Sequence, residues 1–238
     1  MHPIIIYTLS FVALGGLGMY ISSRKADIHT QKQRWLKYIT YIVIVTSIIV
    51  STIYHFFYLL AILIVWVGLF EVIRNCKASL YLKVISLLSY TAISILFIVY
   101  SYTIPVAFLL YIYFQIAIFD GFSQILGQLL GKHKLVSHIS PNKTIEGLAG
   151  GILFTILVAF LTRDWVQVSV QKAILYGILT SLFSLSGDLL ASYFKRLNHI
   201  KDYSNILPGH GGFLDRFDSL MMTGAAYYLL LYQTDRIV

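Results

Sequence analysis

The stretch "LKYITYIVIVTSIIVSTIYHFFYLLAILIVWVGLF", residues 36–70, decides the fold class of this chain. A helix rises about 1.5 Å per residue, so about 20 apolar residues cross the hydrocarbon core of a bilayer. This stretch is too long for one crossing and long enough for two. We expect the break between the two helices near Tyr54 and His55. The chain therefore crosses a membrane more than once.

The composition supports the same conclusion. Of the 238 residues, 58% are hydrophobic and only 12% are charged, whereas about a quarter of the residues in a soluble domain are charged. The apolar run over residues 3–22 lacks a basic region before it and a small-residue cleavage site after it, which predicts a retained span and not a signal peptide. The single cysteine, Cys76, excludes an intrachain disulfide and argues against a cysteine metal site.

We therefore expect an all-α, polytopic integral membrane protein of about eight transmembrane helices. No internal repeat and no soluble domain is evident. Residues 1–118 are expected to form N-terminal transmembrane helices, and residues 119–238 a second transmembrane region that carries the charged motifs. The eight helices are expected at residues 3–22, 36–53, 55–73, 80–100, 103–130, 145–162, 172–198 and 213–232.

The distribution of charge predicts the orientation. With the N-terminus outside, the cytoplasmic connections carry all of the 18 lysines and arginines except Arg163, Lys172 and Arg236, as the positive-inside rule requires. The net charge of +8 then reflects orientation and anionic lipid headgroups, so no nucleic-acid partner is expected. Six acids also lie near this cytoplasmic face, which places the functional site there: Asp120, Glu146, Asp188, Asp202, Asp215 and Asp218.

The segment "SGDLLASYFKR", residues 186–196, aligns three polar side chains at a helix end. Asp188, Ser192 and Lys195 stand at positions i, i+4 and i+7, which share one face of a helix. This pattern also fits a solvated helix end. However, Asp188 follows an apolar run, where an unpaired acid is costly and usually functional.

The segment "PGHGGFLDRFDS", residues 208–219, combines a glycine-rich turn with acids. Glycines allow backbone N–H groups to approach a ligand closely, and the helix that follows presents a positive dipole end to phosphate. Asp215 and Asp218 share a face of that helix, with Arg216 beside them. These carboxylates either offset the helix dipole or hold Mg²⁺, which favours one or two carboxylates together with substrate phosphates. His210 either donates to a phosphate or has no chemical role.

The segment "SPNKTIEG" begins the helix expected at residues 145–162. Ser140 is a candidate N-cap and Pro141 a candidate first helical residue. Lys143 is either a contact for phosphate or a solvated lysine, and Glu146 is a candidate partner of the helix dipole. Upstream, Asp120 interrupts a long apolar helix at its inner end.

Together these residues resemble the phosphatidate cytidylyltransferase family, also called CDP-diacylglycerol synthases. The stretch "SYFKRLNHIKDYSNILPGHGGFLDRFDS", residues 192–219, matches the family pattern of Ser-x-x-Lys-Arg, Lys-Asp, Pro-Gly-His-Gly-Gly and Asp-Arg-x-Asp-Ser. The element "SPNKTIEG" is similar to a second family motif, with Asn142 in place of a common lysine. The resemblance extends from Asp120 to the C-terminal end and does not distinguish the N-terminal helices.

The resemblance implies that CTP and phosphatidate react to give CDP-diacylglycerol and pyrophosphate for phospholipid biosynthesis. It implies that Asp188, Asp215 and Asp218 hold Mg²⁺ and form the catalytic set with Lys195, with room for a second cation. Membrane lipids are expected partners, and a homodimer is an open alternative. The residues that it implies for substrate binding are Ser192, Arg196, Lys201, Asp202, Gly209, His210, Gly211, Gly212, Arg216, Lys143 and Asp120.

Two other functions stay open at this point. One is a CTP-dependent kinase or CDP-lipid synthase that acts on another lipid, whose glycine and lysine motifs would differ. The other is an ion-coupled transporter, which would place acids near mid-membrane and broken helices in both halves of the chain. The acids of this chain gather instead at one face and in one half.

Overall fold

The structure is a computed structural model that describes Gly16, Tyr20 and residues 27–77, 79–204, 206–207 and 211–233. The helix predicted over residues 3–22 lies outside this part of the chain, apart from those two positions. Two strands, β1 (Lys134–Val136) and β2 (Ser140–Thr144), and two 3-10 helices, η1 (Arg163–Trp165) and η2 (Leu214–Arg216), are short. The described α-helices are α2 (Ile28–Ile53), α3 (Phe57–Asn75), α4 (Leu80–Thr103), α5 (Val106–Leu130), α6 (Ile145–Leu161), α7 (Val170–Leu197) and α8 (Asp218–Gln233).

The predicted all-α membrane fold is confirmed. Within the described residues, five helices (α2, α3, α4, α5 and α7) are long and apolar enough to cross a membrane. Helices α6 and α8 have 17 and 16 residues, which is at the lower limit for a span. The predicted number of eight spans is therefore not confirmed, although each predicted helix after the first overlaps a described helix.

The predicted break in the stretch of residues 36–70 is confirmed. Helix α2 ends at Ile53 and α3 begins at Phe57. Between them His55 has a φ of 61°, a left-handed conformation that a helix cannot contain. The Phe56 N–H then donates to the Ser51 carbonyl at 2.8 Å and closes the turn. The apolar stretch therefore forms two helices joined by this turn, as its length requires.

The predicted start of α6 is wrong in one respect. Ser140 and Pro141 are not the N-cap and first helical residue, because both belong to β2, which pairs with β1 in an antiparallel hairpin. The N-cap is Thr144, whose side chain accepts a hydrogen bond from the Gly147 N–H at 3.1 Å. Proline fits an extended edge strand as well as a first helical turn, so the local pattern did not separate the two.

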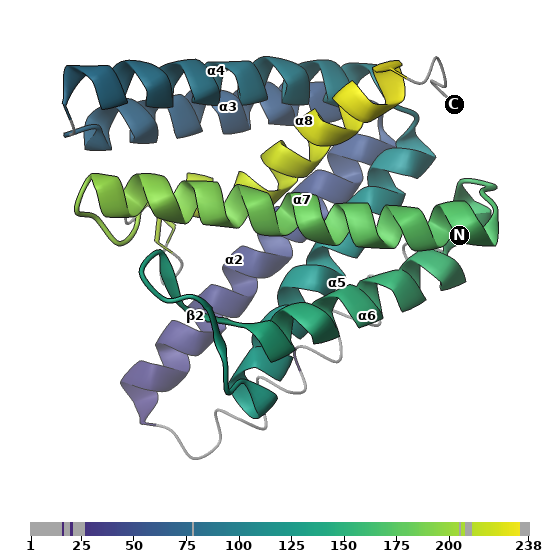
Figure 1. Ribbon diagram of the computed structural model, residues 1–238, viewed down its shortest axis with the longest axis horizontal. Helices are drawn as coiled ribbons and strands as arrows, with labels where there is room; N and C mark the ends of the chain where they lie inside the picture. The colour runs from purple at the N-terminus through teal and green to yellow at the C-terminus, as the bar shows by residue number, and fades with distance from the viewer. Residues whose placement is uncertain are drawn as a thin grey trace.

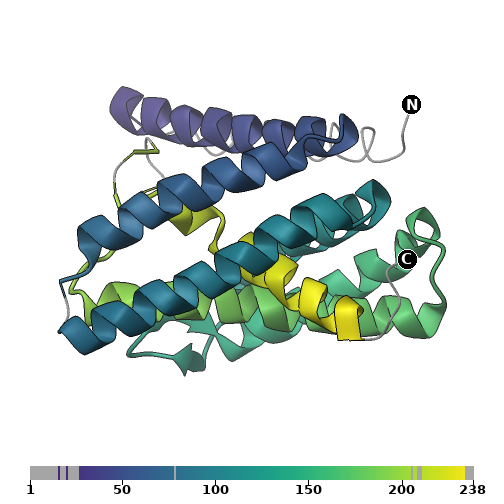
Figure 2. The same ribbon diagram turned by 90° about the horizontal axis from the view of Figure 1, so that it is seen from above.

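Helices α3, α4 and α7 run in similar orientations across the view of Figure 1, whereas α2 and α5 cross them steeply. Helix α4 packs on α3 and α8, α5 packs on α6, and α7 lies between α6 and α8. Helix α2 runs along one edge of the molecule, where it contacts α3 and α5 (Figure 2). Large apolar side chains on α3 and α4 face outward, which suits helices surrounded by lipid.

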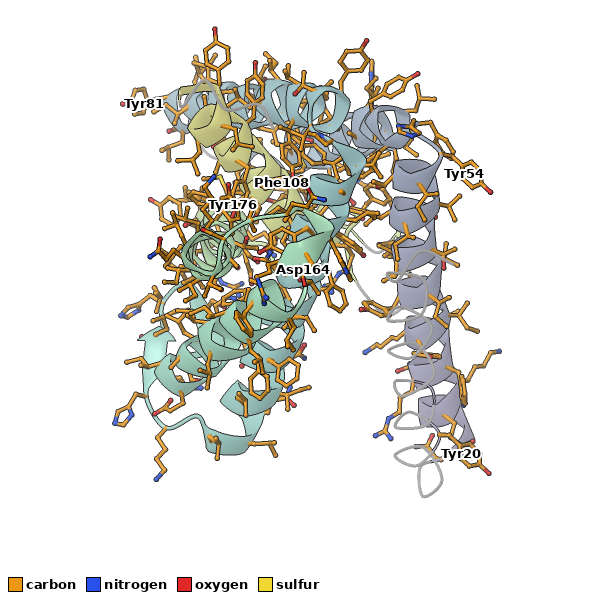
Figure 3. The ribbon with its side chains drawn as sticks, turned by 90° about the vertical axis from the view of Figure 1, so that its right-hand side faces the viewer. Tyr20, Tyr54, Tyr81, Phe108, Asp164 and Tyr176 are labelled. Carbon is orange, nitrogen blue, oxygen red and sulfur yellow. The ribbon has the colours of Figure 1, made fainter. Side chains whose placement is uncertain are left out.

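An aromatic cluster fills the interior of the helix bundle. Phe108 of α5, Tyr176 of α7 and Tyr227 of α8 meet with ring centroids 5.5 to 5.9 Å apart. Figure 3 shows Phe108 and Tyr176 inside the bundle, whereas Tyr54 and Tyr81 lie at its outside. The hydroxyl of Tyr227 donates to the Tyr176 carbonyl at 3.0 Å. This donation satisfies a polar group that would be costly to bury unpaired.

The connection between α7 and α8 is held against the end of α3. The side chain of Asn75 donates to the Tyr203 carbonyl at 2.6 Å, and the Lys77 N–H donates to the side chain of Asn198 at 2.8 Å. The C-terminal ends of α3 and α7 therefore lie together at one end of the bundle. The predicted division at residues 118 and 119 stays a prediction, and these contacts cross it.

Candidate active site

Asp188 lies where α7 and α8 touch. The helices approach so closely at the preceding residue, Gly187, that a Cβ atom there would lie 2.6 Å from the Asp218 carbonyl oxygen. Asp188 forms an ion pair with Lys143 at 2.6 Å and accepts a hydrogen bond from the Ser192 hydroxyl at 3.3 Å. The predicted alignment of Asp188 and Ser192 along one helix face is confirmed, and β2 supplies the cation.

Lys195, the third residue of that predicted face, has a different partner. Its ammonium group lies 2.5 Å from Oδ1 of Asp215. Oδ2 of Asp215 accepts hydrogen bonds from the backbone N–H groups of Tyr203 at 3.1 Å and Gly212 at 2.9 Å. The side chains of Lys195 and Asp215 are only 11% and 3% exposed. Asp215 therefore joins α7, the loop after it and η2 through one buried carboxylate.

Two further carboxylates lie in the electrostatic field of Asp188. Asp120 accepts a hydrogen bond from the Ser184 hydroxyl at 3.0 Å and interacts with Lys143, Asp188 and Arg216. The acids Asp120, Asp188 and Asp218 thus lie near the cations Lys143, Lys195 and Arg216.

Asp218 begins α8 and lies outside the five candidate spans. Its Oδ1 accepts a hydrogen bond from the Ser219 N–H at 2.7 Å. Burial raises the pKa of the Asp218 carboxyl group above its usual range, and the nearby Asp188 carboxylate raises it further, whereas Lys195 opposes the shift. A carboxylate with a raised pKa gains most from a cation, because a cation stabilises its ionised form.

The glycine-rich turn is tightly folded around the loop that precedes it. Gly211 has a φ of 85°, which L-residues rarely adopt. A Cβ atom at Gly212 would lie 2.7 Å from Cβ of Tyr203 and 2.8 Å from Oδ2 of Asp215. Glycine at this position therefore lets the backbone reach the carboxylate. Gly209 and His210 lie outside the described residues, so their predicted roles stay predictions.

The basic residues predicted to bind substrate lie in different parts of the structure. Arg196 is exposed and donates to the carbonyl groups of Ile139 at 3.2 Å and Ile200 at 3.3 Å, so it links the hairpin to the loop after α7. Lys201 and Asp202 line a cavity of about 600 Å³ at the end of α3. Arg216 is exposed on η2. Substrate contacts by these residues stay predictions.

Sequence reasoning missed Glu71 on α3. Its carboxylate is 1% exposed and accepts hydrogen bonds from the Ser204 hydroxyl at 2.5 Å and from the N–H groups of Phe213 at 2.9 Å and Leu214 at 2.7 Å. An acid inside the apolar run "VGLFEVI" was the available signal, because an intramembrane acid is expensive and usually has a partner.

The fit of a magnesium ion follows from these contacts. Among the residues that the structure describes, no three His, Cys, Asp or Glu side chains lie close enough to hold a metal ion together. Asp188 and Asp218 interact across the contact between α7 and α8, and two carboxylates with substrate phosphates suffice for Mg²⁺. Asp215 already has three donors, so its Oδ1 would have to exchange Lys195 for the ion.

Comparison with known proteins shows the family to which the chain belongs. A model of the cytidylyltransferase family matches residues 2–234. The chain belongs to the cytidylyltransferase family. With its apolar helices, this membership indicates a multi-pass membrane protein.

Similar proteins of this family come from staphylococci. A phosphatidate cytidylyltransferase of Staphylococcus epidermidis is 45% identical over 129 residues, which is 53% of this chain and 50% of the relative. A phosphatidate cytidylyltransferase of Staphylococcus aureus is 38% identical over 148 residues, which is 61% of this chain and 57% of the relative. The chain thus spans about half the length of the curated relatives that it matches.

Proposed function

We propose that the protein transfers a cytidylyl group from CTP to phosphatidate, giving CDP-diacylglycerol and pyrophosphate at the cytoplasmic membrane surface. The observation that carries the proposal is the meeting of Asp188, Asp218, Lys143 and the Lys195–Asp215 pair beside a glycine-rich turn. Membership of the cytidylyltransferase family and the names of the staphylococcal relatives support the choice of substrates.

The reaction needs no nucleophilic side chain. An oxygen of the phosphatidate phosphate attacks the α-phosphorus of CTP, and the bond from that phosphorus to the oxygen of the β-phosphate breaks as pyrophosphate leaves. The protein must hold the two phosphates in line and offset their negative charge. Lys143, on the hairpin, and Lys195, at the end of α7, are the cations placed for this task.

Lys143 is the better placed of the two to meet a substrate. Its side chain is 21% exposed and its partner Asp188 is 34% exposed, so a phosphate can approach both. Lys195 is 11% exposed and holds Asp215. We therefore assign Lys143 to substrate phosphate and assign Lys195 first to the orientation of Asp215. Ser192, Arg196, Lys201, Asp202 and Arg216 remain proposed substrate contacts.

Mg²⁺ is the proposed cofactor, held by Asp188 and Asp218, with Asp215 as the third predicted ligand and with room for a second cation. When bound, the ion would offset charge on the attacking and leaving oxygens. Asp120 does not coordinate the ion in this proposal, but its carboxylate adds negative electrostatic potential beside the ion. The cytoplasmic orientation rests on the positive charge of the connections, and it lets CTP arrive from the aqueous phase while the acyl chains stay in the bilayer.

A turnover experiment tests the function. Purified protein in detergent is incubated with CTP, Mg²⁺ and short-chain phosphatidate, and CDP-diacylglycerol and pyrophosphate are measured against a heat-inactivated control. We expect both products in equal amounts. Absence of product in several detergents would refute the proposal. Full replacement of CTP by ATP, or of phosphatidate by another lipid, would favour the kinase or the other CDP-lipid synthase.

A further inference from the structure

Glu71 is a buried acid near the C-terminal end of α3, far in sequence from every predicted site residue. Only 1% of its surface is exposed, and it lies in a helix long and apolar enough to cross a membrane. Within the described residues it has no ion-pair partner within 4 Å. Burying a carboxylate in this way is costly unless hydrogen bonds compensate for the lost water.

Within the described residues, the hydrogen bonds that the side-chain oxygens of Glu71 accept all come from the connection between α7 and α8. Oε1 accepts from the Ser204 hydroxyl at 2.5 Å and from the Phe213 N–H at 2.9 Å, and Oε2 accepts from the Leu214 N–H at 2.7 Å. Phe213 and Leu214 open η2, whose second residue is Asp215. One carboxylate thus holds the backbone at the start of the short helix that carries Asp215.

The same carboxylate joins both ends of the glycine-rich segment. Ser204 precedes this segment and Phe213 follows it, so Glu71 closes the loop at its base. Asn75, one helical turn later on α3, adds the hydrogen bond to the Tyr203 carbonyl. Tyr203 in turn donates its N–H to Asp215. The position of Asp215 therefore depends on two polar side chains of α3.

We infer that Glu71 is a positioning residue for the transfer reaction. It fixes residues 203–204 and 213–214 so that Asp215 faces Lys195 and the turn at Gly212 reaches the Asp215 carboxylate. This inference rests on the proposed function. Glu71 acts through the loop and touches neither substrate nor metal. Its loss therefore changes the geometry of the reacting groups but removes none of them.

The chemistry of the carboxylate distinguishes it from an amide. Three donors meet the two oxygens of Glu71, and glutamine offers one oxygen and one NH₂ group. In Glu71→Gln the NH₂ group therefore faces at least one backbone N–H, a donor against a donor. Glu71→Asp keeps both acceptors and the charge on a side chain that is shorter by one methylene, so it should restore part of the function.

The chain offers a matched control. Ile64 lies two helical turns before Glu71 on the same face of α3 and is fully buried. Ile64→Ala removes packing from the same helix without removing a hydrogen bond from the loop. It reports how far a general loss of stability lowers turnover. Ser204→Ala is a milder second variant, which removes one of the three donors and keeps both backbone N–H groups.

Hydrogen–deuterium exchange of the purified variants provides a readout that does not need turnover. In Glu71→Gln we expect the amides of Phe213 and Leu214 to exchange at least tenfold faster than in the parent protein, the size expected for loss of hydrogen bonds to a charged acceptor. Ile64→Ala should leave these amides within about twofold of the parent, even at an equal melting temperature. Unchanged exchange in Glu71→Gln would overturn the inference.

Turnover then shows whether the loop position matters for the reaction. We expect Glu71→Gln to lower kcat for CDP-diacylglycerol formation at least tenfold, with a smaller change in KM for phosphatidate, Glu71→Asp to be intermediate and Ser204→Ala to be the mildest. An Asp variant less active than the Gln variant would contradict this order. If the parent protein forms no product, the proposed function fails, and the exchange data still decide whether Glu71 holds the loop. If Glu71→Gln does not fold, Glu71→Asp decides the same point: faster exchange at both amides supports the inference, and unchanged exchange overturns it.

Discussion

Removal of one member of the Lys195–Asp215 pair tests the core of the site. The carboxylate is 3% exposed and the ammonium-bearing side chain is 11% exposed, so little solvent screens the pair. Breaking a buried pair from one side costs about 3–5 kcal/mol, because the remaining charge stays buried without a partner. We therefore expect Lys195→Met to lower the free energy of unfolding by about that amount.

Asp215→Asn should cost a similar amount for a different local reason. The amide has one oxygen for three donors, namely Lys195 and the N–H groups of Tyr203 and Gly212. Its NH₂ group must face at least one of them. Because a domain is typically stable by about 5–15 kcal/mol, both variants should still fold, and both should lose turnover.

The double variant, Lys195→Met with Asp215→Asn, gives the decisive measurement. In the double variant both charges are removed, so no unpaired charge stays buried. Its loss of unfolding free energy should therefore be smaller than the sum of the two single losses by about 1–3 kcal/mol. Denaturant or thermal unfolding in one detergent measures all four proteins. Single effects that add within about 0.5 kcal/mol would show that the two side chains are not coupled. Near-normal turnover in Asp215→Asn would remove Asp215 from the site.

Three further predictions follow from the same geometry. Gly212→Ala should lower the free energy of unfolding by about 1–3 kcal/mol through overpacking and abolish turnover, because the new Cβ would lie 2.7 Å from the loop. The control Gly121→Ala, whose Cβ would meet nothing within 4 Å, should be as stable as the parent protein. Lys143→Met should lower kcat/KM at least tenfold because Asp188 and the substrate phosphate lose their cation, and Lys134→Met on the same hairpin should leave it unchanged; equal losses would contradict the assignment. Chelation by EDTA should stop product formation and added Mg²⁺ should restore it; continued turnover in chelator would exclude the metal.

The helices of this protein could be predicted from the sequence because their signal is local. An apolar stretch too long for one span must break, and Tyr54 and His55 lie near its middle. The pairing of Asp188 with Ser192 was likewise local, since four residues is one helical turn.

The polar contacts of the site join segments that are far apart in the sequence, and the spacing of residues within one segment does not reveal them. Lys195 lies on the same face of α7 as Asp188, as predicted, but its ammonium group contacts Asp215, which the loop after α7 brings to it. Ser140 was the predicted N-cap, but the pairing of β2 with β1 places it in a strand, and Thr144 caps the helix instead. Glu71 lies 142 residues before Phe213, so no sequence window contains both.

The attachment of the signature loop to α3 has a consequence for protein engineering. Residues 119–238 contain the Pro-Gly-His-Gly-Gly and Asp-Arg-x-Asp-Ser motifs. Two of the side chains that shape the loop, Glu71 and Asn75, lie outside that region. A chimera that joins residues 119–238 to unrelated membrane helices would place the N–H groups of Phe213 and Leu214 against apolar side chains, where they lose their acceptor. Successful transplantation therefore requires α3 to travel with the loop.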